Sequence, residues 1–180
     1  MITPHPTATD LEALFALFPQ ESYLETFEEV PADRVPQPYH KLLVHQHHMT
    51  VTVEKHHGSL VDVKVIDEYE SGDDYARKIL LTRQSDGKVV QFGLVRIHLH
   101  FCSPAVRKEI LAKQTPLGRI LINNNVLRRI DPTHFLKITP GSAMMDWFGI
   151  SEPKTTYGRL AIIYCDEQPA IELLEIVSPE

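Results

Sequence analysis

The sequence predicts an α+β domain in which helices pack on one face of a single antiparallel sheet of about six strands. Two observations predict this fold class. Apolar segments with strand-like character follow one another in pairs, joined by short polar turns such as Gln84-Ser85-Asp86-Gly87. Helix-starting sequences occur outside these pairs, as at Ser103-Pro104, where serine suits the cap and proline the first turn.

The N-terminal part is expected to begin with a short amphipathic helix. Apolar residues recur at helical spacing from Leu11 to Phe18, and a capping box precedes them at Thr9-Asp10-Leu11-Glu12. Residues 20–35 are acidic and carry prolines, which predicts a surface connection, and 36–48 a short helix or turn. From Met49 the apolar period changes to two, so 49–54 and 60–66 are expected to form a hairpin.

The remaining elements are expected in the following order. Residues 75–83 and 89–101 form a second hairpin, 103–111 a helix, and 116–122 a further helical turn. Residues 126–138 contain a strand in their second half, and 140–156 an ordered loop or lid that holds the one tryptophan. Residues 157–165 and 170–177 close the sheet as a final hairpin.

Composition limits the classes of protein to which the chain belongs. Its 180 residues suit one compact domain, an N-terminal helix and connection over 1–35 followed by the main body over 36–180. A net charge of −6 argues against a nucleic-acid partner. The sequence shows neither a long apolar run nor a secretory signal, so a cytoplasmic protein with no membrane partner is expected. Cys102 and Cys165 fit buried thiols in a reducing compartment.

Two charged residues stand out because each lies within an apolar strand sequence. Arg77 shares a strand face with Tyr75 and Ile79, and Glu175 lies in the last strand. Burying such charges is costly unless they have partners or a polar ligand. A purely structural ion pair between Arg77 and Glu175 is the alternative. Both faces of the last strand are apolar, so the pattern does not decide whether Glu172 or Glu175 points inward.

Other chemistry finds less support in the sequence. His98 and His100 have a spacing that two metal ligands can use, but no acid or cysteine completes a recognised set, so no metal site is predicted. The sequence also shows no glycine-rich phosphate loop and no nucleophile elbow.

With these residues in view, the chain resembles the chorismate pyruvate-lyase family over roughly residues 42–177. The resemblance rests on an ordered set of short motifs: His48-Met49-Thr50, Tyr75-x-Arg77, the Gly93 strand, Thr115-Pro116-Leu117-Gly118-Arg119, Tyr157-Gly158-Arg159, and Pro169 leading to Glu175. It implies that Met49, Arg77, Gly93, Leu117 and Glu175 bind the substrate, and that Arg77 and Glu175 are catalytic. The chain departs from the family at Leu94, where an arginine is expected; Arg96 is the candidate replacement.

The resemblance implies a chorismate lyase-like fold and a cofactor-free lyase. The expected reaction eliminates pyruvate from chorismate to leave a hydroxybenzoate, most simply 4-hydroxybenzoate, and the expected partners are therefore a small-molecule substrate and an aromatic carboxylate product. Two alternatives stay open. One is a non-catalytic, sensor-like domain of the same fold that binds small aromatic carboxylates, and the other is a lyase acting on a related enolpyruvyl compound.

Overall fold

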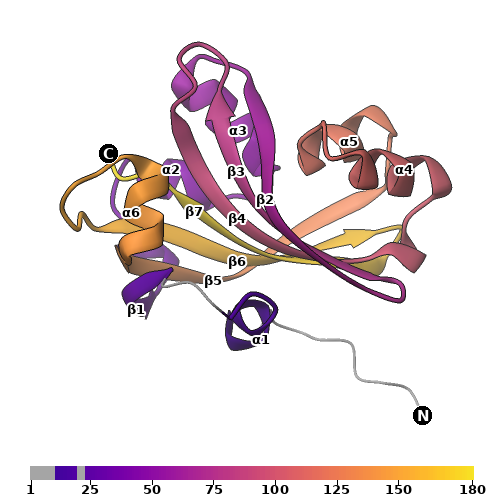
Figure 1. Ribbon diagram of the computed structural model, residues 1–180, viewed down its shortest axis with the longest axis horizontal. Helices are drawn as coiled ribbons and strands as arrows, with labels where there is room; N and C mark the ends of the chain where they lie inside the picture. Colours follow the sequence, from indigo (N-terminus) through magenta and orange to yellow (C-terminus); the bar gives the residue numbers. More distant parts are fainter. Residues whose placement is uncertain (1–10, 20–22) are drawn as a thin grey trace.

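A computed structural model describes residues 11–19 and 23–180 and shows a strongly twisted antiparallel sheet (Figure 1). The sheet has seven strands in the order β1-β5-β6-β7-β4-β3-β2. The strands are β1 (Leu24–Val30), β2 (Val61–Ser71), β3 (Asp74–Arg83), β4 (Val89–His98), β5 (Arg128–Pro140), β6 (Thr156–Cys165) and β7 (Gln168–Val177). The α+β class and the single antiparallel sheet are as predicted, with one strand more than expected.

Four helices pack on one face of the sheet, in agreement with the prediction for that face. They are α2 (Tyr39–Leu43), α3 (Met49–His57), α4 (Pro104–Ala112) and α5 (Leu117–Asn123). Ser103 caps α4 by accepting a hydrogen bond from the Val106 amide, as its sequence predicts. Two short helices, α1 (Leu11–Ala16) and α6 (Ser142–Phe148), contact the other face of the sheet, and Figure 1 shows α1 below it. Two 3-10 turns, η1 (Ala32–Arg34) and η2 (Leu99–Phe101), complete the elements.

The expected hairpin over 49–54 and 60–66 is wrong, because residues 49–57 form helix α3. Its buried residues are Met49, Thr50 and Val53, which lie on one helical face and pack against α2 and the sheet. Helix α3 ends at Gly58, whose φ of +60° is the left-handed conformation that glycine adopts readily. Alternating valine and threonine fit a strand by propensity, but burial of one face stabilises the helix instead.

The N-terminal connection and the expected lid also differ from the prediction. Residues 24–30 form β1, which pairs with β5 and extends the sheet. The expected strand within 126–138 is the longer β5, irregular between Pro132 and His134. Helix α6 occupies part of 140–156 and buries Met144 and Phe148 in the core that also holds α1. The predicted capping residues Thr9 and Asp10 lie outside the described part of the chain.

Two further expectations concern helices and thiols. Within residues 11–19 and 23–180, no helix combines the length and the apolar character needed to cross a bilayer. Cys102 and Cys165 carry free thiols. Burial raises the pKa of Cys165 to about 12, so this thiol is unreactive at neutral pH.

Strand register decides which residues face the α2–α5 helices. Ile79 pairs with Gly93, and Gly93 pairs with Glu175 on its other side. Because side chains alternate along a strand, Arg77 then lies on the same face two residues before Ile79. A Cβ at Gly93 would lie 3.0 Å from Ile79 Cδ1, so a larger residue at this crossing requires the Ile79 side chain to shift. The sheet thus brings charged residues from separate strands to one surface.

Candidate ligand-binding site

A small cavity of about 40 Å³ lies between the sheet and the N-terminal ends of α3 and α5. Polar and small residues contribute to its wall, together with apolar side chains from seven elements, α3, α5, β2, β3, β4, β6 and β7. The lining residues are His48, Met49, Thr50, Val63, Arg77, Ile79, Leu81, Gln91, Gly93, Val95, Leu117, Gly118, Ile163, Leu173 and Glu175. The structure therefore brings all of the site residues named from the sequence, namely Met49, Arg77, Gly93, Leu117 and Glu175, to one cavity.

Arg77 is buried in the cavity wall without a counter-ion. Its side chain is 1% exposed, one terminal nitrogen donates to the Ile110 carbonyl at 3.4 Å, and Nε has no hydrogen-bond partner. Within the described residues, Arg77 forms no ion pair; Glu68, opposite it on β2, is held by Lys113 and Tyr75. Burial lowers the pKa of Arg77, yet a guanidinium remains protonated in proteins. The arrangement favours an anionic ligand.

The expected alternative of an Arg77–Glu175 ion pair is wrong, because Glu175 pairs with Arg159. Arg159 Nε donates to Glu175 Oε2 at 2.7 Å, and the guanidinium is 1% exposed. Its other nitrogens donate to the carbonyls of Leu43, His45 and His47, at 3.3, 2.9 and 3.0 Å. Arg159 thus ties the connection between α2 and α3 to the carboxylate of β7, a role that the sequence motif alone did not reveal.

The choice between Glu172 and Glu175 is settled by the sheet. Glu172 is buried on the other face, where Arg96 Nε donates to it at 2.7 Å and His98 lies at 3.2 Å. Burial raises the pKa of Glu172, but the hydrogen bonds from His98 and Arg96 outweigh it, and the net shift is downward. Leu94 is likewise buried in the core of that face. Arg96 therefore does not replace the family arginine in the cavity.

Two wall residues with an unsatisfied polar atom, His48 and Gln91, were not singled out as site residues from the sequence. His48 is 7% exposed and Gln91 3% exposed, and His48 Nε2 and Gln91 Oε1 lack hydrogen-bond partners. Burial and the nearby charge of Arg128 lower the pKa of His48 to about 4, so its imidazole is neutral at physiological pH. A glutamine within the apolar run of β4 is the same kind of signal that identified Arg77, and it was available in the sequence.

Every buried side-chain atom that lacks a partner in the described part of the chain belongs to this cavity. These atoms are Arg77 Nε, His48 Nε2 and Gln91 Oε1, from β3, the residue before α3, and β4. Buried polar groups in native proteins are almost always satisfied, and exceptions call for an explanation such as a missing ligand or water. Three exceptions around one cavity indicate a polar binding site.

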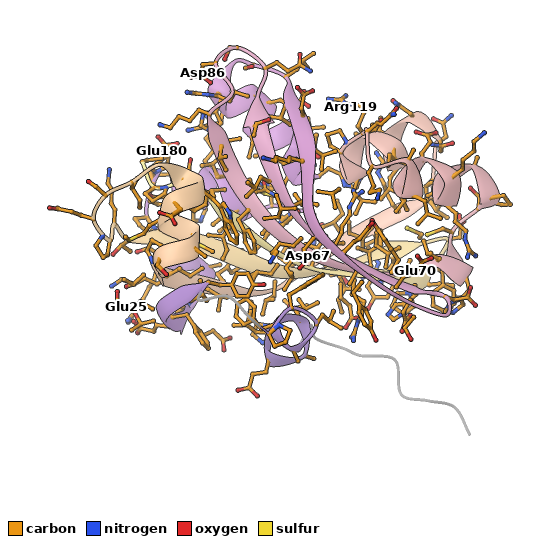
Figure 2. All side chains as sticks on the ribbon, in the orientation of Figure 1. Glu25, Asp67, Glu70, Asp86, Arg119 and Glu180 are labelled. Carbon is orange, nitrogen blue, oxygen red and sulfur yellow. The ribbon has the colours of Figure 1, made fainter. Side chains whose placement is uncertain are left out.

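Helices α3 and α5 close the cavity and meet at Gly118. A Cβ on Gly118 would lie 2.9 Å from His48 Cβ and 3.0 Å from Thr50 Oγ1, so only glycine allows this approach. Arg119, labelled in Figure 2, joins the same helices by donating to both carboxylate oxygens of Glu54 at 2.7 and 2.8 Å. One close contact and one ion pair therefore join the two helices that cover the cavity.

A group with metal-ligand chemistry lies away from the cavity. His56, His57 and Glu180 place ligand atoms within 4.8 Å of one another near the surface. Arg83 lies 3.5 Å from His57 Nδ1, and its positive charge disfavours a cation there.

Comparisons with known proteins place the fold but no family. No protein-family model and no curated protein matches the sequence. The effector domain of PhnF from Mycobacterium smegmatis is similar with a TM-score of 0.51 and 12% identity, over 73% of this chain and 88% of that domain. The C-terminal domain of YurK from Bacillus subtilis gives a TM-score of 0.41 and 14% identity, over 87% and 88%.

PhnF from Mycobacterium smegmatis, in a second structure, gives a TM-score of 0.46 and 13% identity over 73% of this chain. This chain spans 63% of that protein. At such identities the likeness is one of fold.

Proposed function

We propose that the domain reversibly binds a small aromatic monocarboxylate, such as a hydroxybenzoate, in the cavity beneath α3 and α5. The observation that carries this proposal is the convergence of all three unsatisfied buried polar atoms on one cavity that also holds an unpaired guanidinium. The similarity to a domain described as the effector domain of PhnF supports a binding role. The sensor-like alternative named from the sequence is therefore the main proposal.

The energetic cost of these groups supports a ligand. Each unsatisfied buried polar atom costs about 1–3 kcal/mol, so three together cost about 3–9 kcal/mol. The total stability of a domain is about 5–15 kcal/mol. Without a ligand, the three unsatisfied atoms therefore lower the free energy of unfolding by a large fraction of its total. A ligand that forms hydrogen bonds with them removes this loss.

The wall assigns a role to each part of the ligand. Arg77 donates to the carboxylate, since its fork of N–H groups matches two carboxylate oxygens. Gln91 Oε1 accepts a hydrogen bond from a polar substituent, His48 Nε2 accepts or donates one according to the tautomer of its ring, and the Glu175 carboxylate accepts a further hydrogen bond. Ile79, Leu81 and the other aliphatic side chains of the wall contact the ring faces.

The size of the cavity requires a movement on binding. A volume of about 40 Å³ holds only a few waters, whereas pockets for small molecules measure about 300–1,000 Å³. The α3–α5 cover therefore moves outward when a ring enters. A ligand that binds the open form more tightly than the closed form shifts the equilibrium toward the open form. The size of the shift is set by the ratio of the two affinities.

Isothermal titration calorimetry with 4-hydroxybenzoate tests the proposal. We expect saturable binding, and loss of binding to 4-hydroxybenzamide, which has the same shape without the charge. Such a neutral analogue leaves Arg77 unpaired in a buried site, and discrimination of about 100-fold or more is expected. Equal binding of the two compounds, or no binding of either, contradicts the proposal.

A chorismate lyase is the second candidate, favoured by the position of all five family residues in one cavity wall. Elimination of pyruvate aromatises the ring, so the enzyme need only orient the substrate, exclude water and move a proton, a role that falls to Glu175. Within the described residues, however, Arg77 is the only lysine or arginine of the wall, and chorismate carries two carboxylates. One unpaired cation suits a monoanion better.

Incubation with chorismate separates the two candidates. Release of pyruvate that is abolished by Glu175→Gln and by Arg77→Ala establishes the lyase. Binding of 4-hydroxybenzoate without pyruvate release establishes the binding domain.

A further inference from the structure

A second and larger hollow lies outside the cavity, and we call it the outer groove. It has a volume of about 630 Å³ and is formed by the start of α3, the end of α5 and the start of β5. Its lining residues are Gln46, His47, His48, Val51, Ile122, Val126, Leu127, Arg128, Arg129 and Ile130. Val51 and Leu127 are 40% and 66% exposed, so the groove presents apolar side chains to solvent.

The groove is basic. Arg128 and Arg129 line it, and no aspartate or glutamate does. Arg129 pairs with Asp131 and lies over the Tyr164 ring. Arg128 donates to the Val126 carbonyl at 3.2 Å and forms no ion pair with any described residue. A concave surface with an unneutralised guanidinium attracts small anions and raises their local concentration.

His48 separates the outer groove from the cavity. It is the one described residue that lines both. Arg159 holds the backbone just before it through the carbonyls of His45 and His47, and Gly118 packs against its Cβ. The Nε2 atom of its ring has no hydrogen-bond partner. The base of the side chain is thus fixed, while the Nε2 end is held by packing alone and can turn aside without breaking a hydrogen bond.

We propose that the outer groove is a second, transient site for small carboxylate anions and the route by which they reach the cavity, with the His48 ring as the partition. This inference rests on the proposed binding function. An anion is first attracted by Arg128, loses part of its hydration against Val51 and Leu127, and then passes His48 to reach Arg77. The cation outside and the cation inside lie on either side of one movable neutral ring.

The test is to fill the groove without touching the cavity. Val51 lines the groove but not the cavity, so Val51→Trp narrows the route only. The binding constant of 4-hydroxybenzoate is measured by calorimetry and its exchange rates by NMR line shapes. A narrowed route slows association and dissociation by the same factor, roughly fivefold or more, and leaves Kd unchanged. Leu60→Trp, at an exposed apolar residue outside the groove, is the control and changes neither rate.

Two further variants complete the test. Arg128→Gln lowers the association rate and its dependence on salt while leaving dissociation nearly unchanged, because charge steers the approach of the anion. Leu127→Trp repeats the blocking experiment in a loop, should tryptophan in α3 impair folding. Binding with unchanged rates in both tryptophan variants overturns the route and leaves the binding function standing. Failure of the wild-type protein to bind overturns both.

Discussion

Replacing Arg77 by methionine should make the protein more stable and abolish ligand binding. The guanidinium is buried at 1% exposure, its Nε has no partner, its hydrogen bond to the Ile110 carbonyl is long at 3.4 Å, and its other polar contact is with the Tyr75 side chain. Methionine fills a similar volume without charge or polar hydrogens. The variant therefore removes the desolvation cost of a cation and forfeits little hydrogen bonding.

The expected gain follows from these contacts. Relief of the unsatisfied donor contributes about 1–3 kcal/mol, and hydrophobic replacement of buried charges stabilises other proteins by up to about 4 kcal/mol. The lost hydrogen bond subtracts about 1 kcal/mol. We expect a net gain of about 2 kcal/mol, which in a chain of this length raises Tm by about 4–8 °C.

Arg159 provides the matched control, because it is equally buried on the same face but fully paired. Arg159→Met leaves the Glu175 carboxylate without its cation and three carbonyls without their donor. We expect a loss of about 3–5 kcal/mol. Urea unfolding measures both variants, and calorimetry with 4-hydroxybenzoate measures binding. If Arg77→Met is less stable than the wild type, or still binds the ligand, the guanidinium serves the fold and the reasoning fails.

Three further predictions concern titration and packing. His48 has a pKa of about 4 when folded and 6.5 when unfolded, so the free energy of unfolding falls as the pH drops through this window. Between pH 7 and 5, the free energy of unfolding of His48→Gln should therefore fall by about 2 kcal/mol less than that of the wild type, as measured by urea unfolding at each pH. The hydrogen bond to Glu172 raises the pKa of His98, so protonated His98 stabilises the fold below pH 6.5, and this stabilisation is lost as the pH rises above the folded pKa of His98. In His98→Gln, Tm should therefore depend less on pH in this range. Gly158→Ala places a Cβ 2.7 Å from the Glu175 carbonyl and should cost about 2 kcal/mol in urea unfolding.

Much of the fold was predictable because β3, β4, β6 and β7 are apolar runs joined in pairs by short turns. The β3–β4 and β6–β7 hairpins have strong turns, and the Ser103 cap marks α4 in the sequence. Helix α3 was not predictable from Met49 onward, because the alternation of valine and threonine is compatible with a strand as well as with a helix. Its packing over the sheet selects the helix. Strand β1 was missed since its residues are mostly exposed and leave no apolar pattern.

The candidate site was predictable in its members but not in its pairings. Charges in apolar strands identify Arg77 and Glu175 as buried, yet sequence does not say that Arg159 neutralises Glu175 across the β6–β7 pair. Gln91 enters the cavity through strand register, which places it beside Leu81, and His48 through the helix that was expected to be a strand. Tertiary contacts decide both placements.

The pairing of Arg159 has a consequence for how binding is transmitted. The same guanidinium holds the Glu175 carboxylate in the cavity wall and the carbonyls of the connection that precedes α3. A ligand that hydrogen-bonds Glu175 and pushes the α3–α5 cover outward therefore acts on α3 at its start and along its buried face. Under the proposed binding function, a ring needs more room than the cavity of about 40 Å³ provides, so occupancy and the position of α3 would be coupled. That coupling is what a domain needs to convert the presence of a small carboxylate into a change of shape at its surface.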